Sequence, residues 1–173
     1  MQIKTSRLIL REFIREDFQQ LAPLLANPQV MKFSTIGRLS VSQTQAKVES
    51  FISSYSRYGF GKWAVVLKES KDLIGYCGIA VEIIDDQEEK ELGYRLDEKY
   101  WGRGLATEAA SAALEYGLNK LEIAYILGVV ERENIASVKV LKKIGMKYEK
   151  KTVFQGVSMD VYRIEKEKPS GFQ

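Results

Sequence analysis

Residues 91–109 read E-L-G-Y-R-L-D-E-K-Y-W-G-R-G-L-A-T-E-A, and this stretch decides how the middle of the chain folds. Its first part, Glu91 to Leu96, reads as a short strand, and an alanine-rich helix begins at about Thr107. The loop between them carries two glycines and an alanine around one arginine. Because few side chains cover this backbone, successive N–H groups can point at one spot ahead of the helix N-terminus. The pattern predicts a nest for a phosphate or pyrophosphate.

The spacing of the glycines argues against two common phosphate-binding motifs. A P-loop requires G-x-x-x-x-G-K-[ST], and the sequence has no such run. A Rossmann fingerprint requires a third glycine, whereas Gly102 and Gly104 are followed here by Ala106 and Thr107. The ligand of the loop therefore has to be identified from the rest of the chain.

Composition excludes several classes of protein. The chain has 173 residues, 45% of them hydrophobic and 28% charged, which is typical of one soluble domain. The net charge of +3 comes from interleaved acids and bases, so we expect no nucleic-acid partner. The absence of histidine excludes a Ser-His-Asp triad, and the single cysteine, Cys77, excludes a Cys-rich zinc site, so we expect no metal. The sequence has no signal peptide and no membrane-spanning run, so we expect a cytoplasmic protein without membrane contact.

Hydrophobic patterns along the chain predict the order of the elements. The predicted strands cover residues 7–13, 63–67, 73–84, 91–96, 125–130, 148–154 and 158–164. The predicted helices cover about residues 18–26, 42–58, 107–121 and 135–144. Turns at Lys68–Asp72 and at the acidic segment Asp85–Lys90 join successive strands. The order predicts a mixed sheet with helices on both faces, forming a single domain over residues 1–166 with a flexible tail at 167–173.

The loop and the element order together resemble the GNAT N-acetyltransferases. Their Q/R-x-x-G-x-G/A signature, which holds the pyrophosphate of acetyl-CoA, has Gly104 and Ala106 in its small positions and Trp101 in place of Gln or Arg. The run Y-W-G-R-G-L-A-T-E-A is similar to the ribosomal-protein-alanine N-acetyltransferase-like branch, and the R-L-I-L-R opening also fits. The resemblance implies an α/β (α+β) fold with a mixed, mostly antiparallel, splayed sheet of about seven strands.

The resemblance also implies where acetyl-CoA binds. The backbone from Leu92 to Leu96 would meet the thioester and pantetheine, and Lys143 would reach an outer phosphate. Arg103 would pair with the pyrophosphate, although a solvated arginine explains it equally well. The residues expected to bind the cofactor are Tyr94, Leu96, Gly102, Arg103, Gly104, Leu105, Ala106, Thr107, Asn134 and Lys143.

Three residues are candidates for the chemistry of acetyl transfer. The amine must lose a proton and the departing thiolate needs a hydrogen-bond donor, whereas no metal is required. Glu91 is the candidate base, with Glu82 or a water molecule as the alternatives. The family motif N-x-x-S places Asn134 on the pantetheine and Ser137 near the sulfur, although a plain N-cap explains the pair as well. The tyrosine acid found in many relatives is replaced by Leu141, which leaves Ser137 as the candidate.

The expected activity is transfer of acetyl from acetyl-CoA to a primary amine by direct attack in a ternary complex. The branch resemblance favours a protein N-terminal amine as acceptor, and a small amine such as a polyamine or an aminoglycoside is the alternative. A non-catalytic CoA-binding module is the competing class. Phe33, Trp63 and Tyr76 are the residues expected to line the acceptor cleft, although aromatic residues at such positions also belong to cores.

Overall fold

One mixed sheet organises the computed structural model, which describes residues 1–171. Among these residues, eight strands lie in the order β1-β2-β3-β4-β5-β6-β8-β7. The strands are β1 (Gln2–Lys4), β2 (Leu8–Arg11), β3 (Lys62–Leu67), β4 (Leu73–Ile84), β5 (Gln87–Leu96), β6 (Tyr125–Val130), β7 (Lys147–Phe154) and β8 (Val157–Glu165). The helices are α1 (Phe18–Leu25), α2 (Val41–Tyr58), α3 (Leu105–Asn119) and α4 (Ile135–Lys143), with short 3-10 turns η1 (Arg15–Asp17) and η2 (Glu98–Tyr100). The predicted fold class is confirmed, with one strand more than expected.

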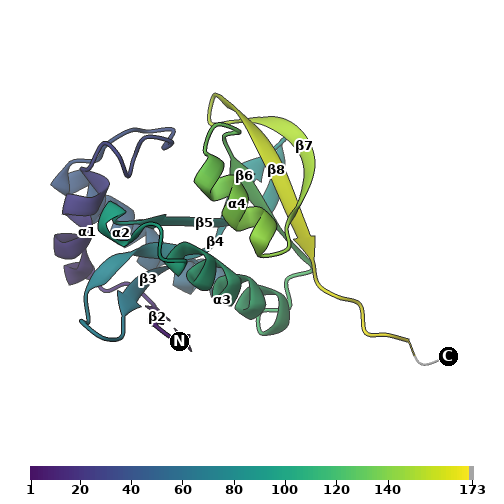
Figure 1. Ribbon diagram of the computed structural model, residues 1–173, viewed down its shortest axis with the longest axis horizontal. Helices are drawn as coiled ribbons and strands as arrows, with labels where there is room; N and C mark the ends of the chain where they lie inside the picture. The colour runs from purple at the N-terminus through teal and green to yellow at the C-terminus, as the bar shows by residue number, and fades with distance from the viewer. Residues whose placement is uncertain (172–173) are drawn as a thin grey trace.

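The sheet splits between β5 and β6. All other neighbouring strands pair antiparallel, whereas β5 and β6 run parallel and pair only at Glu91 with Leu127 and at Leu92 with Gly128. Among the described strands, none pairs with Gly93–Leu96 on that side. Figure 1 shows α1 and α2 on one side of β5, and α4 with β6 to β8 on the other. The splay expected from the family resemblance is therefore present, and it leaves backbone groups of β5 available to a ligand.

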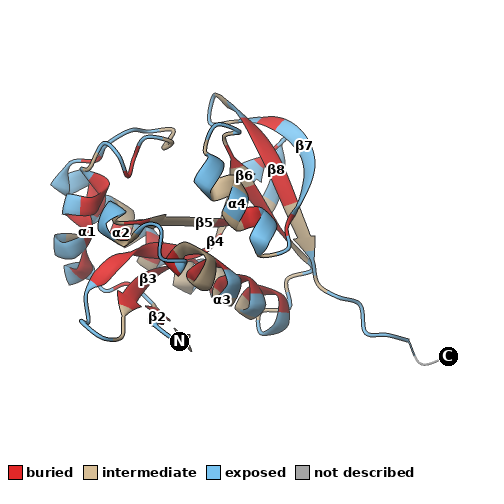
Figure 2. Ribbon diagram, in the orientation of Figure 1, coloured by how far each residue is buried: buried red, intermediate tan, exposed pale blue. Residues whose placement is uncertain are grey.

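Alternation along the strands places two cores on opposite faces of the sheet. Trp63 and Val65 of β3 pack in the cluster that contains α3, whereas Ala64 packs in the cluster of α1 and α2. Successive strand residues point to opposite faces, which explains this division. Figure 2 shows buried residues in red along β3, β4 and the helix sides that face them. The face under α3 and the face under α2 therefore present different side chains to the splay.

The turn between β4 and β5 is shorter than the sequence suggested. Residues Asp85–Lys90 were expected to form one acidic turn, but the strand already resumes at Gln87. Only Asp85 and Asp86 turn, with φ of 50° and 64°, which is the left-handed pair of a two-residue hairpin turn. The polar and charged residues from Gln87 to Lys90 pair along the end of β4. That prediction was wrong because polar residues on an exposed hairpin carry no periodic signal.

Other boundaries differ by a few residues. Helix α3 begins at Leu105 rather than Thr107, directly after Gly104, and β1 was not predicted. Residues 166–171 form no helix or strand, and residues 172–173 of the predicted tail lie outside the described residues. The end of the domain at residue 166 stays a prediction. Within residues 1–171, no helix combines the length and apolar character needed to cross a bilayer.

Candidate active site

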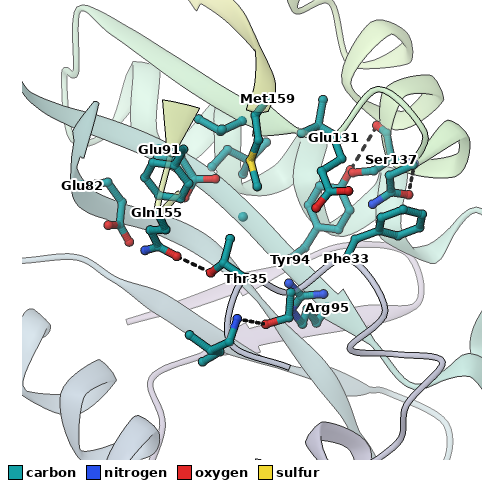
Figure 3. Close-up of a pocket in the computed structure, with 18 of the residues that line it drawn as sticks. Phe33, Thr35, Glu82, Glu91, Tyr94, Arg95, Glu131, Ser137, Gln155 and Met159 are labelled. Carbon is teal, nitrogen blue, oxygen red and sulfur yellow. Dashed lines mark hydrogen bonds between the residues drawn. The ribbon is translucent and has the colours of Figure 1, made fainter. Parts of the chain in front are cut away.

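Two adjoining hollows meet at the splay, and they share residues of β5 and α4. The α3-side groove, about 530 Å³, runs along the loop before α3, and the α2-side cavity, about 270 Å³, lies between the loop after α1, β4, β5 and the β7–β8 hairpin. The residues common to both are Phe33, Tyr94, Arg95, Asn134 and Ser137. Figure 3 shows Tyr94 and Ser137 at this junction. A ligand in the groove and a second ligand in the cavity would therefore meet at these residues.

The groove ends at the glycine loop predicted to be a phosphate nest. Gly102 and Gly104 both have left-handed backbones, with φ of 72° and 75°. Gly104 is also the N-cap of α3, and because it has no side chain, no cap hydrogen bond covers the first turn. The Trp101 Nε1–H donates to the Leu96 carbonyl at 2.9 Å and ties the loop to the end of β5. The first N–H groups of α3 are thus open toward the groove, as an anion site requires.

Most residues expected to bind the cofactor line this groove. They are Tyr94, Leu96, Gly102, Gly104, Leu105, Ala106, Thr107 and Asn134. Arg103 is not among the described lining residues, and its guanidinium lies 5.5 Å from the centre of the Tyr100 ring. Lys143 does not line the groove either and is exposed at the end of α4. Lys32 and Lys139 supply positive charge there instead, and single lysines without a motif gave no signal in the sequence.

Tyr94 and Ser137 form a hydrogen bond at the junction. The Tyr94 hydroxyl lies 2.8 Å from Ser137 Oγ. The Ser137 backbone N–H donates to Asn134 Oδ1 at 3.3 Å, so Asn134 caps α4 as predicted. Burial raises the pKa of the Tyr94 hydroxyl, and the bond to Ser137 opposes that rise only in part. Tyr94 is therefore a neutral hydrogen-bonding group at ordinary pH.

Glu91 lies inside the α2-side cavity beside a lysine. Its side chain is 13% exposed, and Oε2 lies 3.3 Å from Lys62 Nζ. Burial raises the pKa of the Glu91 carboxyl, the Lys62 ammonium opposes this rise, and the Glu82 carboxylate adds to it. Because Ala80 pairs with Glu91, Glu82 is its diagonal neighbour on the same face of the sheet. Both candidate bases thus face one cavity, with Glu91 nearer the splay.

The aromatic residues expected at the acceptor cleft divide into two groups. Phe33 and Tyr76 line the α2-side cavity. Trp63 does not, because its side chain points to the other face of the sheet, where it is 1% exposed and stacks edge-on against Tyr116 at 5.5 Å. The placement of Trp63 at the cleft was therefore wrong: it is a core residue on the α3 side.

The cavity is bridged on one side by a contact that the sequence did not reveal. The Thr35 hydroxyl, in the loop after α1, donates to Gln155 Oε1, at the tip of the β7–β8 hairpin. Figure 3 shows this contact, with Glu82, Glu91 and Glu131 around the cavity. The partners are 120 residues apart in sequence, so no local pattern could have paired them. The contact joins the loop after α1 to the hairpin across one side of the cavity, which both residues line.

Comparison with known proteins agrees with this geometry. The sequence model described as the acetyltransferase (GNAT) domain matches residues 7–147, which is most of the chain. The chain belongs to the GNAT acetyltransferase family. It is 35% identical over 147 residues to YkkB of Bacillus subtilis, covering 84% of this chain and 85% of that one. It is also 32% identical over 149 residues to the N-acetyltransferase YnaD of the same organism, covering 86% of this chain and 84% of that one.

Solved structures of GNAT proteins superpose over nearly the whole chain. The GNAT acetyltransferase of Bacillus anthracis gives a TM-score of 0.83 at 26% identity, covering 97% of this chain and all (100%) of that one. The ribosomal L7/L12 α-N-protein acetyltransferase RimL, solved in complex with coenzyme A, gives 0.79 at 18% identity, covering 95% and 98%. At that identity RimL supports the fold alone. This GNAT protein is thus an acetyl-CoA-dependent acetyltransferase that acts on an amine.

Proposed function

We propose that acetyl-CoA lies in the α3-side groove and that the acceptor amine enters the α2-side cavity. The observation that carries this proposal is the junction of the two hollows at the splay of β5 and β6. A pyrophosphate on the N–H groups after Gly104 would direct the pantetheine along β5 toward Tyr94. The thioester would then meet the amine between Ser137 and Glu91. Asn134 would hold the pantetheine from the opposite wall.

The proposed chemistry is direct attack of the amine on the thioester. The nitrogen lone pair forms the new C–N bond, the C–S bond breaks, and its electron pair leaves on sulfur. The amine proton passes to Glu91, directly or through water, and Ser137 donates a hydrogen bond to the thiolate. Glu82 and solvent are the alternative proton acceptors. Free N–H groups of β5 beyond Leu92 would stabilise the negative charge that develops on the carbonyl oxygen.

A compact amine fits the cavity better than a protein chain does. The contact between Thr35 and Gln155 bridges one side of the hollow of about 270 Å³, so a peptide that entered between the loop and the hairpin would have to break it. Glu82 and Glu131 line the cavity, and neither forms an ion pair with another described residue, so both are free to bind a cationic acceptor. Relatives include the Escherichia coli spermidine N(1)-acetyltransferase, 32% identical over 40% of this chain. A protein N-terminus, the acceptor of RimL, remains the second candidate.

An acetylation screen that follows release of free CoA tests the acceptor. The panel contains spermidine, an aminoglycoside, and peptides beginning with alanine or serine, each with a matched Nα-acetylated peptide as control. We expect turnover of a small amine and little turnover of the peptides. Turnover of peptides with free N-termini and none of the small amines would reverse the choice. Binding of acetyl-CoA without CoA release for any amine would instead favour the non-catalytic module.

Removal of this contact separates the two acceptor classes further. Thr35→Val removes the hydroxyl that donates to Gln155 and keeps the shape of the side chain. If a compact amine is the acceptor, its KM should rise because the cavity loses one wall. If a peptide is the acceptor, its KM should fall, because the loop and hairpin no longer have to be pulled apart. The matched control is Thr5→Val. It removes a threonine hydroxyl directly after β1 and so controls for the loss of a threonine hydrogen bond outside the cavity.

A further inference from the structure

Lys62 is a lysine buried within the sheet, which is an unusual place for a single positive charge. It begins β3, is 8% exposed, and lines the α2-side cavity. Its Nζ donates to the Gly78 carbonyl and to Glu91 Oε2, both at 3.3 Å. Lysine is almost never buried unless it is paired, so this ammonium has a specific partner rather than a solvated position.

Two glycines provide the space that the Lys62 side chain occupies. Gly78 and Gly93 pair with each other across β4 and β5, and Lys62 pairs with Gly78. A Cβ at Gly93 would lie 2.3 Å from Lys62 Nζ and 3.3 Å from Glu91 Oε2. A Cβ at Gly78 would lie 2.8 Å from Lys62 Cα. The sheet thus carries no side chains at the two positions over which the lysine extends toward the carboxylate.

The charged surroundings of Glu91 come from three strands. The charged groups that face it are Lys62 of β3, Glu82 of β4 and Arg95 of β5. Cys77 and Tyr94 pair with each other and point to the opposite face of the sheet, into the α3-side core. Arg95 directs its guanidinium to the Val30 carbonyl at 3.2 Å, and Glu82 carries the same charge as Glu91. Lys62 is therefore the cation in direct contact with this carboxylate.

We propose that Lys62 is a positioning residue that holds Glu91 in its ionised, proton-accepting form and fixes the direction of its carboxylate. This inference rests on the proposed role of Glu91. Replacing a buried lysine that only stabilised the fold would change the free energy of unfolding and leave the pH dependence of kcat/KM unchanged.

The test measures the pKa of the Glu91 carboxyl directly, in protein without ligands and with the side-chain carboxyl carbon of glutamate labelled for NMR. Glu91→Gln assigns the signal. Lys62→Met keeps length and removes charge, and we expect the pKa of Glu91 to rise by about one unit or more. Gly93→Ala leaves the lysine in the chain but pushes its ammonium away, so we expect a shift in the same direction. Lys47→Met, at another lysine of the cavity, should leave the Glu91 titration where it is.

The second readout is the pH dependence of kcat/KM. We expect its acidic limb to move to higher pH in Lys62→Met and Gly93→Ala, and to return toward the wild-type position in Lys62→Arg. An unchanged Glu91 titration in folded Lys62→Met protein overturns the inference. If the pKa of the Glu91 carboxyl rises while the acidic limb of kcat/KM stays in place, the result supports Lys62 as the partner of Glu91 but overturns Glu91 as the base. The failure of the inference and the failure of the proposed function are therefore distinct results.

Discussion

The Tyr94 hydroxyl lies 2.8 Å from Ser137 Oγ, and this contact joins the two sides of the splayed sheet. Tyr94 belongs to β5 and Ser137 to the first turn of α4, which follows β6 in the chain. The contact therefore spans the point at which β5 and β6 separate. It also directs the serine hydroxyl toward the place where the groove and the cavity meet. A thiolate leaving at this point would find a hydroxyl already held in position.

Ser137→Ala tests the role of that hydroxyl. We expect kcat to fall about tenfold, the effect of one hydrogen bond of about 1.4 kcal/mol, with little change in thermal stability. Stability is spared because the helix cap uses the Ser137 backbone N–H, which alanine retains. Steady-state kinetics and thermal unfolding measure the two quantities. Turnover at the wild-type rate would contradict a role for Ser137 at the thiolate.

Asn134 combines a cap with a proposed contact to the pantetheine, and two substitutions separate them. Asn134→Ala removes both, so we expect a loss of about 1 kcal/mol in the free energy of unfolding and a higher KM for acetyl-CoA. Asn134→Asp keeps a capping oxygen but loses the amide donor, so stability should be retained while KM still rises. Denaturant unfolding and kinetics provide the measurements. A wild-type KM for acetyl-CoA in the aspartate variant would indicate that Asn134 acts only as the helix cap.

The glycine loop is tested at Gly104. Gly104→Ala adds a Cβ to the loop that lines the α3-side groove, and it strains a backbone with φ of 75°. We expect acetyl-CoA to bind at least tenfold more weakly by calorimetry, about 1.4 kcal/mol. Gly59→Ala is the matched control, because Gly59 has φ of 79° and open space but lies at the end of α2. If Gly59→Ala weakens the binding of acetyl-CoA as much as Gly104→Ala does, backbone strain rather than phosphate contact explains the loss.

The corrected position of Trp63 gives a fourth prediction. Because this side chain is 1% exposed in the core under α3, Trp63→Ala should lower the free energy of unfolding by about 3–5 kcal/mol. The KM for the acceptor should be unchanged under conditions where the variant is folded. Urea unfolding and acceptor kinetics check both statements. A higher KM for the acceptor with normal stability would indicate that Trp63 lines the acceptor cleft after all.

The sequence predicted the fold well because its strands and helices carry strong periodic signals. The loop before α3, the cap at Asn134 and the strand with Glu91 were found because each is a local motif. The hairpin turn was misjudged, since Asp85 and Asp86 turn through backbone angles that neighbouring charges do not reveal. Trp63 was misplaced because alternation along one strand does not say which face of a sheet holds the site.

The contacts that complete the site could not be predicted, because they join distant segments. Lys62 and Glu91 are 29 residues apart, and Thr35 and Gln155 are 120 apart. A lysine at the start of a strand is normally expected to be solvated. The burial of Lys62 depends on glycines in the next two strands, β4 and β5. The only signal for it was the pair Gly78 and Gly93, which becomes informative once β4 and β5 are aligned.

The pH dependence of kcat/KM in Glu91→Gln tests the central claim most directly. The base must be ionised, so activity falls as the pH drops through the pKa of the Glu91 carboxyl, which burial raises above its ordinary value. Glutamine keeps the shape but accepts no proton, so kcat/KM should fall by roughly 10²-fold or more. The acidic limb should disappear, and acetyl-CoA affinity should stay nearly unchanged. If Glu91→Gln keeps the limb and Glu82→Gln removes it, the account of Glu91 as the base is contradicted.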